Sequence, residues 1–124
     1  MSGSHKRKPA LAGAVLIWDG NERPLVEGVP VVIGSDPKST IPVHNDEMVN
    51  PKHVTVTLGP DYVSVLTDLG VSISLIEYKG MTGQFEGEIQ ADEDLEFMLH
   101  RGNLDANAVR FINFRVVIND AYSD

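Results

Sequence analysis

The chain has 124 residues, no cysteine, 42% hydrophobic residues and a net charge of −8 at pH 7. These values are typical of one ordinary globular domain that buries a core without disulfides. They argue against disorder, and against a duplex nucleic-acid partner, whose phosphates bind lysine and arginine. No apolar run approaches the roughly 20 residues of a membrane span, so we expect no membrane segment here, although a longer parent protein could carry one.

The first nine residues are predicted to be a flexible basic tail. Residues 5–9 read "HKRKP", and residues 1–5 look like a leftover of an expression tag. The basic run could touch an acidic partner or a membrane surface, but a solvated terminus is the favoured interpretation. The chain shows no repeat, low-complexity run or linker, so residues 10–120 are expected to form one domain, followed by a C-terminal tail at 121–124. The absence of cysteine suits a reducing compartment, and we expect a cytoplasmic location.

The stretch "VVIGSDPKST", residues 31–40, superficially resembles a nucleotide-binding loop. Such a loop needs a second glycine directly before its lysine and a helix directly after it. Pro37 stands where that glycine is needed, and Pro42 is a poor continuation of a helix. The nucleotide-binding interpretation therefore fails.

Most of the remaining chain alternates apolar and polar residues with a period of two. The pattern is clear in Val54–Leu58, in Val63–Val65 and in the C-terminal run 112–118. Such alternation is typical of strands with one face on a core and one in water. About ten candidate strands, separated by glycine-, proline- and aspartate-containing turns, predict an all-β protein with little or no helix.

The order of features between Val29 and Leu75 is more specific. A strand ending in Ile33-Gly34 is followed by "STIPV", then "NDEMVNPKHVTV", then a glycine turn and "YVSVLTDLG". This resembles the forkhead-associated (FHA) domain, whose pattern is a strand ending Gly-Arg, then Asp-Ile-x-Leu, Ser-x-x-His and Asp-Leu-x-Ser-x-Asn-Gly-Thr. The resemblance implies a two-sheet β-sandwich of about eleven strands, whose loops at one end bind phosphothreonine peptides.

The framework positions of that pattern are present. They are Gly34, Ile41, Val43, His53 and Asp68-Leu69. By the resemblance, Gly34, His53 and Asp68 are structural, and the ring of His53 is expected to hydrogen-bond loop backbone. A catalytic or metal-binding role for His53 is less well supported, because His44 and His100 show no ligand spacing.

The phosphate-reading positions of the pattern differ. Ser35 replaces the arginine, Asn50 replaces the serine of Ser-x-x-His, and Ile73-Ser74 replace Asn-Gly. A serine offers one hydroxyl where arginine presents a charged fork of donors, and isoleucine cannot pin a peptide backbone. The amide of Asn50 can still donate a hydrogen bond. The resemblance therefore implies an FHA-like domain that has lost ordinary phosphothreonine binding.

Other side chains offer weaker signals. Lys38, Ser39 and Lys52, with Thr40, could form a makeshift anion site on adjacent loops, although two solvated lysines are the simpler interpretation. The acidic residues Glu86, Glu88, Asp92, Glu93 and Asp94 lack the order of a calcium loop and indicate a solubilising surface. Trp18 and Tyr78 are expected to be core or half-buried strand residues, though either could anchor a partner.

No arrangement of nucleophile and base, metal ligands or paired carboxylates indicates an enzyme, and we expect no catalytic residue, metal or cofactor. Two functions stay open. The first is a protein–protein interaction module that binds its partner by shape, for example as a cytoplasmic domain of a secretion machine. The alternative is a phosphopeptide reader that uses altered contacts from Lys38, Ser39, Asn50 and Lys52.

Overall fold

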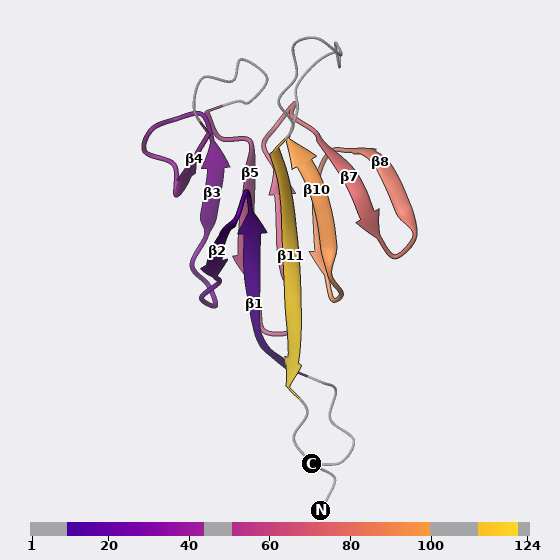
Figure 1. Cartoon of the computed structure of the whole chain (residues 1–124). Helices are drawn as coiled ribbons and strands as arrows, with labels where there is room; N and C mark the ends of the chain where they lie inside the picture. Colours follow the sequence, from indigo (N-terminus) through magenta and orange to yellow (C-terminus); the bar gives the residue numbers. More distant parts are fainter. Residues whose placement is uncertain (1–9, 44–50, 100–111, 122–124) are drawn as a thin grey trace, which may run out of the picture.

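The computed structural model describes residues 10–43, 51–99 and 112–121. These residues form eleven strands and no helix (Figure 1). The strands are β1 (Ala10–Trp18), β2 (Asn21–Pro24), β3 (Val31–Gly34), β4 (Ile41–Pro42), β5 (Val54–Leu58), β6 (Val63–Thr67), β7 (Ile73–Tyr78), β8 (Met81–Phe85), β9 (Glu88–Ala91), β10 (Leu95–Leu99) and β11 (Ile112–Ala121). The predicted all-β architecture of about eleven strands is confirmed. Likewise, none of the described residues lies in a helix long and apolar enough to cross a membrane.

The strands make two sheets. One has six strands in the order β2-β1-β11-β10-β7-β8, and the other has five in the order β4-β3-β5-β6-β9. Neighbouring strands are antiparallel except for β3 and β4, which run parallel. The first and last strands pair along their whole length, from Ala10 opposite Ala121 to Trp18 opposite Phe114. This pairing joins the two ends of the described chain in the six-stranded sheet.

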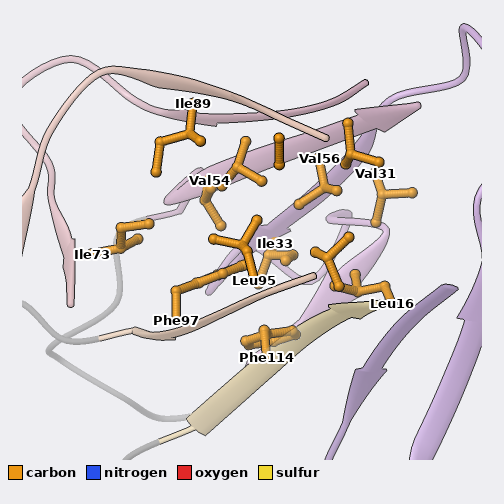
Figure 2. Packing of buried hydrophobic residues seen from close by; sticks show 14 of the residues in the cluster. Leu16, Val31, Ile33, Val54, Val56, Ile73, Ile89, Leu95, Phe97 and Phe114 are labelled. Carbon is orange, nitrogen blue, oxygen red and sulfur yellow. The ribbon is translucent and has the colours of Figure 1, made fainter. Parts of the chain in front are cut away.

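The core lies between the sheets and follows the predicted alternation. In β5 and β6 every second residue is buried, and the same holds in β10. Figure 2 shows side chains of both sheets meeting in this layer, among them Ile33 and Val54 from the five-stranded sheet and Phe97 and Phe114 from the six-stranded sheet. The rings of Phe97 and Phe114 stack with centroids 5.5 Å apart. Each such buried side chain contributes roughly 1.5–3 kcal/mol, so the core fixes the register of both sheets.

Both aromatic residues noted in the sequence belong to this core region. Trp18 is half-buried and stacks on Phe114 at 5.8 Å between ring centroids, and Tyr78 is buried. Tyr78 also precedes the two-residue turn between β7 and β8, in which Lys79 and Gly80 both have positive φ, 51° and 78°. Such a turn matches the natural twist of a hairpin and sets the direction of β8.

Candidate functional site

Three connecting segments meet at one end of the sandwich, which we call the loop end. They are residues 35–40 between β3 and β4, residues 51–53 before β5, and residues 68–72 between β6 and β7. In Figure 1 this is the upper end, toward which β3 points and from which β7 leaves. Loops carried on rigid strands are where binding residues of sandwiches concentrate, so the contacts of these segments decide what the loop end can do.

His53 joins its own segment to the end of β3 and to the segment between β6 and β7. Its side chain is completely buried, and its backbone N–H donates to the carbonyl of Ile33 at 2.8 Å. Its carbonyl accepts from the N–H of Asp68 at 3.0 Å, and its ring Nε2 donates to the carbonyl of Ser72 at 2.7 Å. Because a carbonyl only accepts, this last bond requires the proton on Nε2. His53 thus has the backbone-bonding geometry of a structural histidine, in a position sealed from any ligand.

The loop between β3 and β4 is folded back on itself and onto Pro51. The carbonyl of Pro51 accepts from the N–H of Asp36 at 3.3 Å and from the hydroxyl of Ser39 at 3.2 Å. The carboxylate of Asp36 accepts from the N–H of Lys38 at 2.9 Å, as in an Asx turn. Thr40 caps the adjoining strand, since its hydroxyl accepts from the N–H of Val32 at 3.0 Å. The side chains of Asp36, Ser39 and Thr40 therefore bond backbone groups of the loop, of Pro51 and of β3.

The loop between β6 and β7 has a different character. This loop is fixed at Asp68, whose carbonyl accepts from the N–H of Val71 at 3.1 Å. Between Asp68 and Val71, Leu69 is 97% exposed and Gly70 has a φ of 76°. A leucine held this far out by a fixed turn gains nothing from folding, because its apolar surface stays in water. Leu69 therefore presents exposed apolar surface at the tip of this loop.

The residues proposed from the sequence are only partly brought together here. Ser35 and Ser39 are half-buried in the β3–β4 loop, while the side chains of Lys38 and Lys52 are exposed on segments joined through Pro51. This arrangement does place the two lysines on neighbouring segments. Asn50 lies outside the described residues.

Ile73 and Ser74, expected on a loop facing the phosphopeptide, instead form the first two residues of β7. Ile73 is completely buried, opposite Leu99 on one side and Phe85 on the other. The physical reason is its phase: it alternates with Leu75 on the inward face, so its side chain belongs to the core. Nothing carried at position 73 reaches the loop surface.

Two loop-end residues, Asp36 and Ser72, were missed in the sequence. Asp36 could have been found, because Asp-Pro at residues 36–37 is a turn signal whose carboxylate bonds backbone two residues on. Leu69 was named as a framework position, but its 97% exposure could not be foreseen, because an apolar residue after Asp68 gives no hint that it faces water. Ser72 carries two contacts that join β7 to other segments, its carbonyl to His53 and its hydroxyl to the amide of Gln84 at 2.8 Å.

The opposite end of the sandwich, which we call the turn end, holds a charged cluster. The hydroxyl of Tyr78 donates to the carboxylate of Asp92 at 3.0 Å, and the Lys79 ammonium lies 2.8 Å from the same oxygen. The bonds from Lys79 and then Tyr78 lower the pKa of Asp92, and the bond to Asp92 raises the pKa of Lys79. Burial is the main cause that raises the pKa of Tyr78. The cluster links the turn before β8 to the turn after β9.

The titratable side chains described at the two ends are engaged in structural contacts. Among residues 10–43, 51–99 and 112–121, no three His, Asp or Glu side chains gather closely enough to hold a metal ion. His53 is buried and engaged with backbone, and the turn-end carboxylate is held by two partners. Among the described residues of the three segments, Lys38, Lys52 and Leu69 are exposed.

No protein-family model matches the sequence, and no curated protein matches it either. Solved structures do. The FHA domain of CT664 from Chlamydia trachomatis is 20% identical over 90% of this chain and 100% of that one, with a TM-score of 0.61. The N-terminal FHA domain of Saccharomyces cerevisiae Rad53p, solved with a phosphothreonine peptide, is 14% identical over 86% of this chain and 94% of that one, with a TM-score of 0.63. FHA-1 of Mycobacterium tuberculosis Rv1747 is 10% identical over 90% and 99%, with a TM-score of 0.63. The fold is therefore that of FHA domains, as the sequence motif predicts.

Proposed function

We propose that this chain is a non-catalytic protein–protein interaction module that recognises its partner through the loop end, without ordinary phosphothreonine recognition. The FHA fold supports the module, since the Rad53p domain of this fold was solved with a phosphothreonine peptide and the FhaA FHA domain with the intracellular domain of Rv3910. Fold alone does not carry function, so the proposal rests on the loop-end residues.

One observation carries it: the described positions that align with the family's phosphopeptide contacts offer a phosphate no positive charge. Ser35 supplies at most a neutral hydroxyl where the FHA pattern has arginine. Ile73 is buried and supplies nothing to the surface. Phosphothreonine brings nearly two negative charges toward a domain of net charge −8. The electrostatic field of the whole domain therefore repels the phosphate and does not compensate for the missing guanidinium.

The remaining surface favours contact by shape. Leu69 stands at the tip of the β6–β7 loop, 97% exposed, on a backbone fixed through His53 and Asp68. A rigid apolar contact orders little on binding, which favours affinity per contact. We further propose that the module works in the cytoplasm as one part of a larger assembly, such as a secretion machine.

A second function has a specific observation in its favour. Lys38 and Lys52 are exposed on segments joined through the Pro51 carbonyl, so both ammonium groups could approach one phosphate. Lysine binds phosphate as a point charge without the geometry of arginine. A phosphopeptide reader built this way would be weak and strongly salt-dependent, and Asp36 beside Lys38 would oppose it.

A two-dimensional NMR titration with a phosphothreonine peptide and its unphosphorylated twin tests the proposal. We expect no phosphate-dependent shifts beyond a weak background that disappears with salt, because each charge-assisted phosphate bond is worth about 1.5–3 kcal/mol, or roughly one to two orders of magnitude in affinity. Lys38→Ala with Lys52→Ala is the matched control for that background. Tight phosphate-dependent binding that this double variant abolishes would favour the second function instead.

A further inference from the structure

The two open sheets leave four edge strands, β2 and β8 in one sheet and β4 and β9 in the other. An edge strand presents unpaired N–H and C=O groups, and natural proteins guard it with charges, prolines or very short length. Three of the four edges here are guarded: β2 reads Asn-Glu-Arg-Pro, β4 has two residues and ends in Pro42, and β9 begins with Glu88.

The fourth edge strand, β8, carries none of these guards. Its sequence Met-Thr-Gly-Gln-Phe contains no charge and no proline, and its first four residues are exposed. It lies at the outer margin of the six-stranded sheet (Figure 1). At its centre Gly83 has a φ of 117°, and a Cβ placed there would meet no atom within 4 Å. A glycine in open space on a strand is where another backbone can approach closely.

The faces of β8 are fixed by its pairing with β7. Gly83 lies opposite Leu75 and Phe85 opposite Ile73, both buried, so Met81, Gly83 and Phe85 share the inward face. Thr82 and Gln84 share the outward face. In an antiparallel pair of two β8 strands centred on Gly83, Met81 would face Phe85 of the second copy and Thr82 would face Gln84. The first is a sulfur–aromatic pair and the second a hydrogen-bonding pair, and both are favourable cross-strand combinations.

The charges that flank β8 fit the same arrangement. Lys79 precedes the strand and Glu86 follows it. In the antiparallel register centred on Gly83, Lys79 lies opposite Gly87 of the other copy and Glu86 lies opposite Gly80, so no like charges face each other, and the two-fold symmetry repeats this arrangement at the far end. A parallel pairing would instead set lysine beside lysine and glutamate beside glutamate. The strand is therefore complementary to itself in one orientation.

We propose that two copies of this chain associate edge to edge through antiparallel β8 strands, in the register centred on Gly83. The two six-stranded sheets then form one continuous sheet. The two-fold axis is perpendicular to this sheet, so the two loop ends point in opposite directions. A dimer of this kind presents two recognition surfaces at once, and it could bridge two partner molecules or bind a repetitive partner with avidity.

The test is sedimentation equilibrium of the whole chain and of two double variants. Thr82→Glu with Gln84→Glu sets acid opposite acid at both symmetric positions, whereas Thr82→Glu with Gln84→Lys sets acid opposite base. Both variants lose the same Gln84 contact to Ser72, so they are matched. Protein concentrations from about 10 μM to about 1 mM, in about 0.15 M salt to screen the net charge, cover weak association.

We expect the unmodified chain to dimerise within this range. The acid–base variant should keep a dimer, and the acid–acid variant should dissociate at least about tenfold more readily, because like charges directly opposite destabilise a strand pair. A chain that stays monomeric at about 1 mM overturns the proposal. So do two folded variants that dimerise equally, since the register predicts that they differ; dispersed NMR spectra establish that each is folded.

Discussion

The two ends of the sandwich are held by different kinds of contact. At the loop end, the buried His53 joins its own segment to β3 and to the segment between β6 and β7 through backbone carbonyls and N–H groups. At the turn end, the exposed charges of Lys79 and Asp92 meet the hydroxyl of Tyr78. Unmade hydrogen bonds in a buried place are costly, whereas exposed ion pairs contribute little and are screened by salt. We therefore expect the contacts at the loop end to contribute more to stability than those at the turn end.

The largest expected effect tests whether the loop end is built on the core. Ile73→Asn should destabilise the domain by about 3–5 kcal/mol, because it removes a buried apolar side chain and leaves an amide without partners. This is a large share of a typical free energy of unfolding, so the variant could be unfolded altogether. Urea denaturation followed by circular dichroism measures it.

Ile73→Val is the matched control, with an expected loss of about 0.5–1.5 kcal/mol. If Ile73→Asn has the same free energy of unfolding as the unmodified chain, position 73 faces the loop surface. The reconstruction of a family-like asparagine would then be feasible there.

The second prediction concerns the histidine that joins the segments. His53→Ala should cost about 1–3 kcal/mol, since it leaves the carbonyl of Ser72 without its partner in a buried place. The NMR signals of Ile33 and of residues 68–72 should move together, because both are hydrogen-bonded to residue 53. Lys52→Ala, one residue away and exposed, should stay within about 0.5 kcal/mol. If the two variants were equally stable, the buried hydrogen bonds of His53 would add nothing to the loop end. The contrast with the turn end would then disappear.

Much of the fold was predictable because it follows from local alternation. The spacing of residues such as Val54 and Val56 predicts the inward face of a strand, and glycine-containing turns indicate where strands end. His53 and its neighbours were recognisable because the Asn-Pro-Lys-His segment sits in a known motif. These features depend on residues close together in the chain.

The parts that were not predictable depend on phase or on distant partners. An ungapped reading of "DLGVSISL" puts Ile73 on a loop, whereas pairing with Leu99 and Phe85 pulls it into β7. The exposure of Leu69 follows from a turn fixed by His53, fifteen or more residues away. The unguarded edge of β8 becomes visible only when the strand order is known.

The smallest expected effect sharpens the comparison at the turn end. Asp92→Asn keeps an oxygen that can accept from the Tyr78 hydroxyl but removes the charge that holds Lys79. At neutral pH we expect a shift of the urea midpoint in the same direction as that of His53→Ala but smaller, because the carboxylate and the ammonium are both exposed. Glu22→Gln, on the edge strand β2, is the control for loss of one negative charge.

The pH dependence of that shift identifies its origin. Because its two partners lower the pKa of Asp92 in the folded chain, the carboxylate stabilises the fold above its ordinary pKa of 3.8, and this stabilisation is lost as the pH falls through the lower folded value. The difference between the unmodified chain and Asp92→Asn isolates the contribution of residue 92. The difference should be constant near neutral pH and should vanish in acid well below 3.8. The His53→Ala shift has no such carboxylate origin and should persist there. A turn-end difference that survives full protonation would mean that packing around Tyr78, rather than charge, closes that end of the sandwich.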